Sequence, residues 1–140
     1  MRKLGLVALL ALAACSPPAP RVDSQGQAER KAVDAATKTY ASCVTAATSA
    51  LNVSGENAGT LALTAMKSCA KDRTALIGLT AKFWLLGHPA ATPDKAEYQQ
   101  RLSVAVAEAS VQTIEDDMRQ QAVVAIVDRQ TDADIAKVNP

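Results

Sequence analysis

Apolar and small residues recur every three or four positions along this chain, and that spacing constrains the fold more than any other feature. Steps of three and four residues place side chains on one face of an α-helix. The chain is also rich in alanine, which has the highest helix propensity of all residues. In the first predicted helix, over residues 24–51, the recurring positions are Ala32, Ala36, Tyr40, Cys43, Ala47 and Leu51.

A second helix is predicted over residues 57–86, after the turn residues Asn52–Gly55. Its last residues, Phe83-Trp84-Leu85-Leu86, are consecutive, so helical geometry spreads them around most of the circumference. If Phe83 and Leu86 lie on the core face, Trp84 or Leu85 is exposed and could mark a partner contact; the alternative is that the third helix folds over this end and buries the segment. The predicted apolar face of this helix consists of Leu61, Ala65, Cys69, Leu76, Leu79, Phe83 and Leu86.

A third helix is predicted over residues 93–128. Thr92 is a candidate N-cap, and Pro93 suits the first helical position, where its missing N–H is harmless. Residues 131–140 are polar and are expected to form a loosely ordered tail. Two apolar stripes run along the helix: Leu102, Ala105, Ala109 and Thr113 form one, and Ala107, Val111, Ile114, Met118, Ala122 and Ala125 form the other.

The beginning of the chain has the features of an export signal. Arg2 and Lys3 precede an uncharged apolar segment over residues 4–14, which is too short to span a bilayer. The sequence Leu12-Ala13-Ala14-Cys15 resembles the lipobox of bacterial lipoproteins. The resemblance implies a signal peptide over residues 1–14, cleavage before Cys15 and acylation of that cysteine. The alternative is an ordinary signal peptide followed by an incidental thiol.

The lipoprotein resemblance also implies a location. Residues 15–23 are rich in proline and are expected to form an extended tether. Retention at the inner membrane is associated with an aspartate just after the lipidated cysteine, and Ser16 occupies that position. The resemblance therefore favours a lipid anchor in the bacterial outer membrane, facing the periplasm, and two or more acyl chains would hold the protein firmly there.

Two cysteines remain after Cys15, and in an oxidising compartment they predict a disulfide between Cys43 and Cys69. Their midpoint is residue 56, within the predicted turn, so two antiparallel helices would bring both cysteines to the same height. The predicted fold is therefore all-α: an antiparallel three-helix bundle over residues 24–130 that contains a disulfide-clamped hairpin.

The charge and the polar residues narrow the function. Loss of Arg2 and Lys3 with the signal peptide changes the formal charge from +1 to −1. A chain this close to neutral does not attract nucleic acid electrostatically, so we expect no nucleic-acid partner. His88 lacks carboxylate or cysteine neighbours, so we expect no metal site. The run Glu115-Asp116-Asp117, with Arg119 nearby, is interpreted as a salt-bridged, solvated face. We therefore expect that the chain is not an enzyme and that it binds no cofactor and no small-molecule substrate.

Phe83, Trp84, Leu85 and His88 are the candidate contact residues for a partner. The leading hypothesis is a small, non-enzymatic envelope lipoprotein whose helical domain binds another envelope protein. Pilotins, which escort secretin subunits, are similar in size, anchor and helical content, but the chain shares no motif with them. The alternative is a periplasmic inhibitor or immunity protein that acts on a toxin or a cell-wall hydrolase through the loop over residues 87–94.

Overall fold

A computed structural model describes residues 24–138, and within this range every regular element is a helix. The predicted signal peptide, the lipidated Cys15 and the tether lie outside the described residues. The all-α prediction is confirmed. The helices are α1 (Ser24–Ala50), α2 (Ala58–Ser68), α3 (Ala70–Gly87) and α4 (Pro93–Val138).

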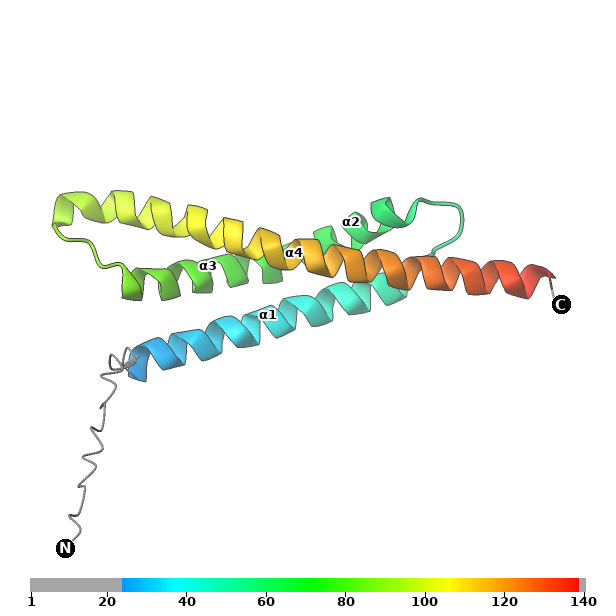
Figure 1. The fold of residues 1–140 in the computed structure, drawn as a ribbon, viewed down its shortest axis with the longest axis horizontal. Coiled ribbons are helices and arrows are strands. Elements are labelled where there is room, and N and C mark those ends of the chain that lie inside the picture. The colour runs from blue at the N-terminus through cyan, green and yellow to red at the C-terminus, as the bar shows by residue number, and fades with distance from the viewer. Residues whose placement is uncertain (1–23, 139–140) are drawn as a thin grey trace, which may run out of the picture.

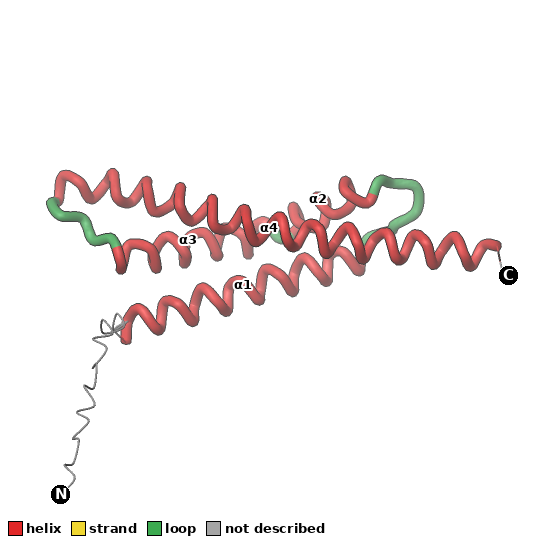
Figure 2. Tube along the Cα trace, viewed as in Figure 1, coloured by secondary structure: helices red, strands yellow, loops and turns green. Residues whose placement is uncertain are grey.

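The helices form an elongated assembly (Figure 1). α1 and α4 run in the same direction, while α2 followed by α3 returns in the opposite direction. The connection from α1 to α2 lies near the end where α4 finishes, and the α3–α4 connection lies at the end where α1 begins (Figure 2). α3 makes more extensive contacts with α1 and with α4 than these two long helices make with each other, so α3 packs between them.

The described chain has four helices where three were predicted, because the second predicted helix is divided at Cys69. This residue has φ −100° and ψ 20°, which is not a regular helical conformation. The Ser68 hydroxyl donates to the carbonyl of Ala65 at 2.6 Å, in competition with the backbone. The Cys69 N–H then bonds to the carbonyl of Met66 at 3.0 Å, a tight i to i−3 bond, and a new helix begins at Ala70.

The disulfide between Cys43 and Cys69 is confirmed. The two Cα atoms are 6.0 Å apart, and the bridge joins α1 to the junction of α2 and α3 across 26 residues of sequence. Cys69 is itself buried in the main core cluster. The disulfide therefore attaches the junction of α2 and α3, where the chain bends, to α1.

The predicted end of the last helix near residue 128 is also wrong, because α4 continues to Val138. The residues expected to form a loose tail are helical up to that point. The Thr131 hydroxyl donates to the carbonyl of Val127 at 2.9 Å, inside the continuing helix. No glycine or proline interrupts residues 129–138, so no local signal stops the helix.

The core has a central and a distal cluster along the bundle. The central cluster contains Tyr40, Val44, Cys69, Leu76, Val111 and Met118. The distal cluster contains Leu61, Ala62, Ala122 and Ile126.

Buried positions test the predicted stripes. On α4, Ala107, Val111, Met118 and Ala122 are buried, which confirms most of the second predicted stripe. Ala105, Ala109 and Thr113 of the first stripe are exposed. The expectation that Leu86 faces the core is wrong: its side chain is exposed, one residue before α3 ends at Gly87.

Turn and cap residues explain where the helices begin. The Asn52 carboxamide oxygen accepts from the Ser54 N–H at 3.1 Å, which closes the turn after α1. The Asn57 side chain caps α2 by accepting from the Gly59 N–H at 2.8 Å. α4 begins at Pro93, as predicted, with Asp94 in its first turn.

Candidate functional site

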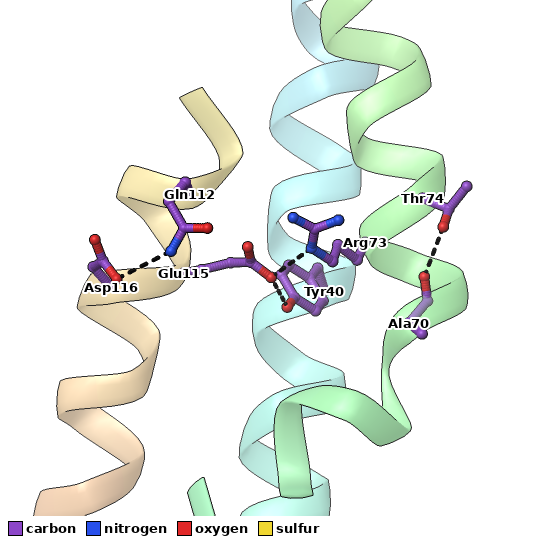
Figure 3. A network of polar contacts seen from close by, with 7 residues as sticks. All are labelled: Tyr40, Ala70, Arg73, Thr74, Gln112, Glu115 and Asp116. Carbon is purple, nitrogen blue, oxygen red and sulfur yellow. Dashed lines mark hydrogen bonds and ion pairs between the residues drawn. The ribbon is translucent and has the colours of Figure 1, made fainter. Parts of the chain in front are cut away.

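Three polar side chains from three helices meet inside the bundle (Figure 3). Glu115 of α4 accepts a hydrogen bond from the Tyr40 hydroxyl of α1 at 2.7 Å. The same carboxylate oxygen accepts from Arg73 Nε of α3 at 2.8 Å. Tyr40 is completely buried and Glu115 nearly so. We call these three residues the Tyr–Arg–Glu cluster.

Electrostatics hold the two donors of the Tyr–Arg–Glu cluster in their protonated forms. Burial and the hydrogen bond to Glu115 raise the pKa of Tyr40 far above its usual range. The hydrogen bond to Glu115 also raises the pKa of Arg73, although burial opposes this. Neither donor therefore changes its protonation near neutral pH. These properties suit a structural role, in which the cluster joins α1, α3 and α4.

The interpretation of residues 115–117 as a solvated face is wrong for Glu115. Asp116 does behave as expected: it pairs with Arg119 at 3.3 Å and accepts from Gln112 at 3.2 Å, both on the surface. Glu115, however, lies four residues after Val111 and three before Met118, and both of these are buried. Its place in this apolar stripe is the sequence signal that identifies it as an inward-facing residue.

A shallow groove of about 310 Å³ lies beside the cluster, between α4 and the junction of α2 and α3. Its charged residues are largely paired with one another, since Arg73 binds Glu115 and Arg119 binds Asp116. Apolar lining comes from α2 and α3. The residues that line the groove include Leu63, Met66, Lys67, Ala70, Arg73 and Gln112.

The predicted contact residues lie at the α3–α4 end of the bundle. Phe83, Trp84 and Leu85 are half-buried and His88 is exposed. The His88 ring stacks on the Trp84 indole, with centroids 4.0 Å apart and planes 6° from parallel. His88 Nδ1 lies 2.9 Å from the Trp84 carbonyl oxygen. His88 therefore closes the C-terminal turn of α3, a role that the sequence did not predict.

This end of the bundle also exposes apolar side chains. Leu86 and Tyr98 are 38% and 59% exposed. An ion pair between Lys82 of α3 and Glu29 of α1 ties the first helix to the same end. We call Trp84, Leu86, His88 and Tyr98 the tip. Exposed aromatic and aliphatic side chains are enriched in protein interfaces.

Between residues 24 and 138, the structure supports neither a metal site nor a membrane-spanning helix. In that range, no three His, Cys, Asp or Glu residues are grouped so that they could hold a metal ion. None of the described helices combines the length and the apolarity that crossing a membrane requires. Comparison of the chain with protein-family models, with curated proteins and with solved structures finds no match.

Proposed function

We propose that this chain is a small, non-enzymatic envelope lipoprotein, anchored in the outer membrane through acyl groups on Cys15, whose helical domain binds another envelope protein at the tip. In this proposal α2 and α3 act as one bent rod, and the domain works as an antiparallel three-helix bundle. The Leu12-Ala13-Ala14-Cys15 motif supports the anchor. The Cys43–Cys69 bridge is in keeping with an oxidising compartment.

The observation that carries the proposal is the exposure of apolar side chains at the tip. Trp84 is held in place by the stacked His88 ring, so its conformational freedom is already restricted before a partner binds. Preordered aromatic side chains are favoured in interfaces because little entropy is lost when they are covered. Leu86 and Tyr98 are also exposed at this end of the bundle.

The Tyr–Arg–Glu cluster supports a binding role over a catalytic one. A general acid or base works best when its pKa is near the working pH. In this cluster the pKa values of Tyr40 and Arg73 are moved further from neutrality. The cluster fixes the relative positions of three helices, and such rigidity suits a domain that presents a surface.

Two other binding modes are each favoured by one feature. The connection over residues 88–92 is exposed throughout, as the loop of an inhibitor or immunity protein would be. A groove of about 260 Å³ between α1 and α4 is lined partly by Ala41, Thr45 and Ala125, small residues that would let a partner helix approach, as a pilotin requires. We consider both surfaces less favoured than the tip for binding a partner, because neither contains a tryptophan or tyrosine side chain.

Site-specific photo-crosslinking in intact cells tests the proposal. A photoreactive residue at position 86 or 98 should crosslink to one envelope protein. Position 63 is the matched control, because Leu63 is also an exposed aliphatic residue but lies on α2. The substitution Tyr98→Asp should abolish the product formed from position 86. Crosslinks to the same envelope protein that arise equally from position 63, or only from position 90 in the loop or 45 in the groove, would contradict the tip as the binding surface.

A further inference from the structure

The C-terminal part of α4 carries an uncovered apolar face. Val124, Val127, Ile135 and Val138 are 60%, 45%, 55% and 79% exposed. With Thr131, which is also exposed, they occupy about 80° of the helix surface at 100° per residue. We call these five residues the α4 strip. The buried Ala122 and Ile126 lie on a different face, so the strip is separate from the surface that packs against the core.

The strip is open to a partner along its length. α4 extends past α2 and past the α1–α2 connection, and its last turns project from the bundle (Figure 1). At its other end, the strip continues into a groove of about 630 Å³ between α2 and α4, which Leu63, Val123 and Val124 help to line. Exposed aliphatic residues repeated at steps of three and four are typical of a helix–helix seam.

The spacing of the strip is symmetric about Thr131. Val124 and Val138 lie seven residues before and after it, and Val127 and Ile135 lie four residues before and after it. If two copies of α4 pair antiparallel around a two-fold axis at Thr131, each aliphatic residue meets an aliphatic residue of the second copy. A two-fold interface requires this kind of self-complementary surface, whereas binding of an unrelated helix does not.

We propose that the α4 strip is a self-association surface at which two copies of this chain pair antiparallel. Val124 then packs against Val138 of the second copy, and Val127 packs against Ile135 of the second copy. The exposed area is small beside the roughly 1,600 Å² of a standard interface, so the pairing is reversible. Because α1 begins at the opposite end of the molecule, the two tips lie at the outer ends of the pair and stay open.

The charges beside the strip distinguish antiparallel from parallel pairing. Asp128 and Asp132 lie on one flank of the strip, whereas the other flank carries Asp134, whose charge is paired with Lys137 at 2.8 Å. Antiparallel pairing places the flank with Asp128 and Asp132 of one copy against the same flank of the second copy. Salt screens repulsion between exposed charges, so higher ionic strength should strengthen the association.

Cysteine crosslinking of the full chain in its own membrane tests the proposal. Thr131→Cys alone should form a disulfide-linked dimer, because the two copies of residue 131 meet on the axis. Val124→Cys alone should not, whereas cells that contain both Val124→Cys and Val138→Cys chains should form the mixed dimer. Ser110→Cys, an exposed position on α4 outside the strip, is the matched control. All four positions are at the surface, so the fold should survive.

The outcomes separate the possibilities. Adding Val127→Glu to Thr131→Cys should reduce the dimer at least tenfold, and raising the salt concentration in isolated membranes should increase it at least twofold. A dimer from Val124→Cys alone that equals the dimer from Thr131→Cys would show parallel pairing and overturn the proposal. No dimer from Thr131→Cys, a yield equal to that of Ser110→Cys, or crosslinking to a different protein would also overturn it.

Discussion

At the scale of single residues, Glu115 has the most unusual environment in the described chain. It is a nearly buried carboxylate on the core-facing stripe of α4, and one of its oxygens accepts from both Tyr40 and Arg73. Burying a charge is unfavourable unless partners compensate it, and these donors come from two other helices. The ion pair therefore contributes to the relative placement of the helices as well as to stability.

Replacing Glu115 with Gln should lower the free energy of unfolding by about 2 kcal/mol, because the charge-assisted bonds to Arg73 and Tyr40 are lost while the volume is kept. The Arg73 side chain is about one-third exposed, which limits the loss. Urea unfolding followed by circular dichroism measures the change. Asp116→Asn, which removes the exposed neighbouring carboxylate, should change stability by less than about 0.5 kcal/mol. Equal effects of the two substitutions would contradict the buried role of Glu115.

Tyr40 gives a pH dependence whose direction follows from its raised pKa. In the unfolded chain a tyrosine loses its proton near pH 10, whereas folded Tyr40 keeps its proton to higher pH. The stabilising contribution of the folded state is present below pH 10 and is lost as the pH rises above it. Well above pH 10, but below the raised pKa of folded Tyr40, the free energy of unfolding should therefore fall by up to about 1.4 kcal/mol per pH unit more in the wild type than in Tyr40→Phe. Tyr98→Phe is the control, and a slope that Tyr40→Phe leaves unchanged would contradict the assignment.

At the scale of helices, sequence patterns succeeded where a local signal exists. The end of α1, the start of α4 and the Cys43–Cys69 pair followed from turn residues, Pro93 and the symmetric placement of the cysteines about a turn. The division at Cys69 was missed because it contains neither glycine nor proline. It depends on the Ser68 hydroxyl and on a bridge to another helix.

Long-range contacts explain the other differences from the sequence predictions. The stripe position of Glu115 indicates that it faces inward, but its partners could not be identified because they lie 42 and 75 residues away in the sequence. α4 continues beyond residue 128 partly because Arg129 and Gln130 bind the chain that follows α1. Gln130 donates to the carbonyl of Val53 at 2.7 Å. No pattern within residues 129–138 indicates these bonds.

Removing the disulfide should weaken the hairpin. For a loop of 26 residues, the chain-entropy model gives about 3–4 kcal/mol of stabilisation. The double variant Cys43→Ala/Cys69→Ala should lose approximately this much in denaturant unfolding, and a reductant should then have no further effect on it. In the wild type, the reductant should produce a similar loss. If the wild type is equally stable with and without reductant, the bridge does not constrain the chain as described.

Arg129 should contribute to stability by binding the end of α1. Its guanidinium donates to the carbonyls of Thr48 and Leu51, each at 2.9 Å, and so satisfies the C-terminal end of α1. Arg129→Gln should lower the free energy of unfolding by about 1–2 kcal/mol and speed hydrogen exchange over residues 49–57. Arg119→Gln, which removes only a surface pair, serves as the comparison. Unchanged exchange in Arg129→Gln would contradict this capping role.

At the scale of the whole molecule, the described chain is an elongated helical body with different surfaces at its two ends. The tip lies at the end where α1 begins, and the α4 strip lies toward the opposite end (Figure 1). Between these ends, the Tyr–Arg–Glu cluster joins α1, α3 and α4, and the disulfide joins α1 to the junction of α2 and α3. In the proposed function, the body holds the tip in a fixed relation to the start of α1, which follows the anchor in sequence.

Intact-mass analysis of the protein purified from native membranes tests the anchor and the disulfide together. The chain should begin at Cys15, carry acyl groups on that residue and contain one disulfide, which peptide mapping should assign to Cys43 and Cys69. A chain that retains residues 1–14, an unmodified Cys15, or free thiols at Cys43 and Cys69 would contradict the account of an exported, acylated and disulfide-clamped helical domain.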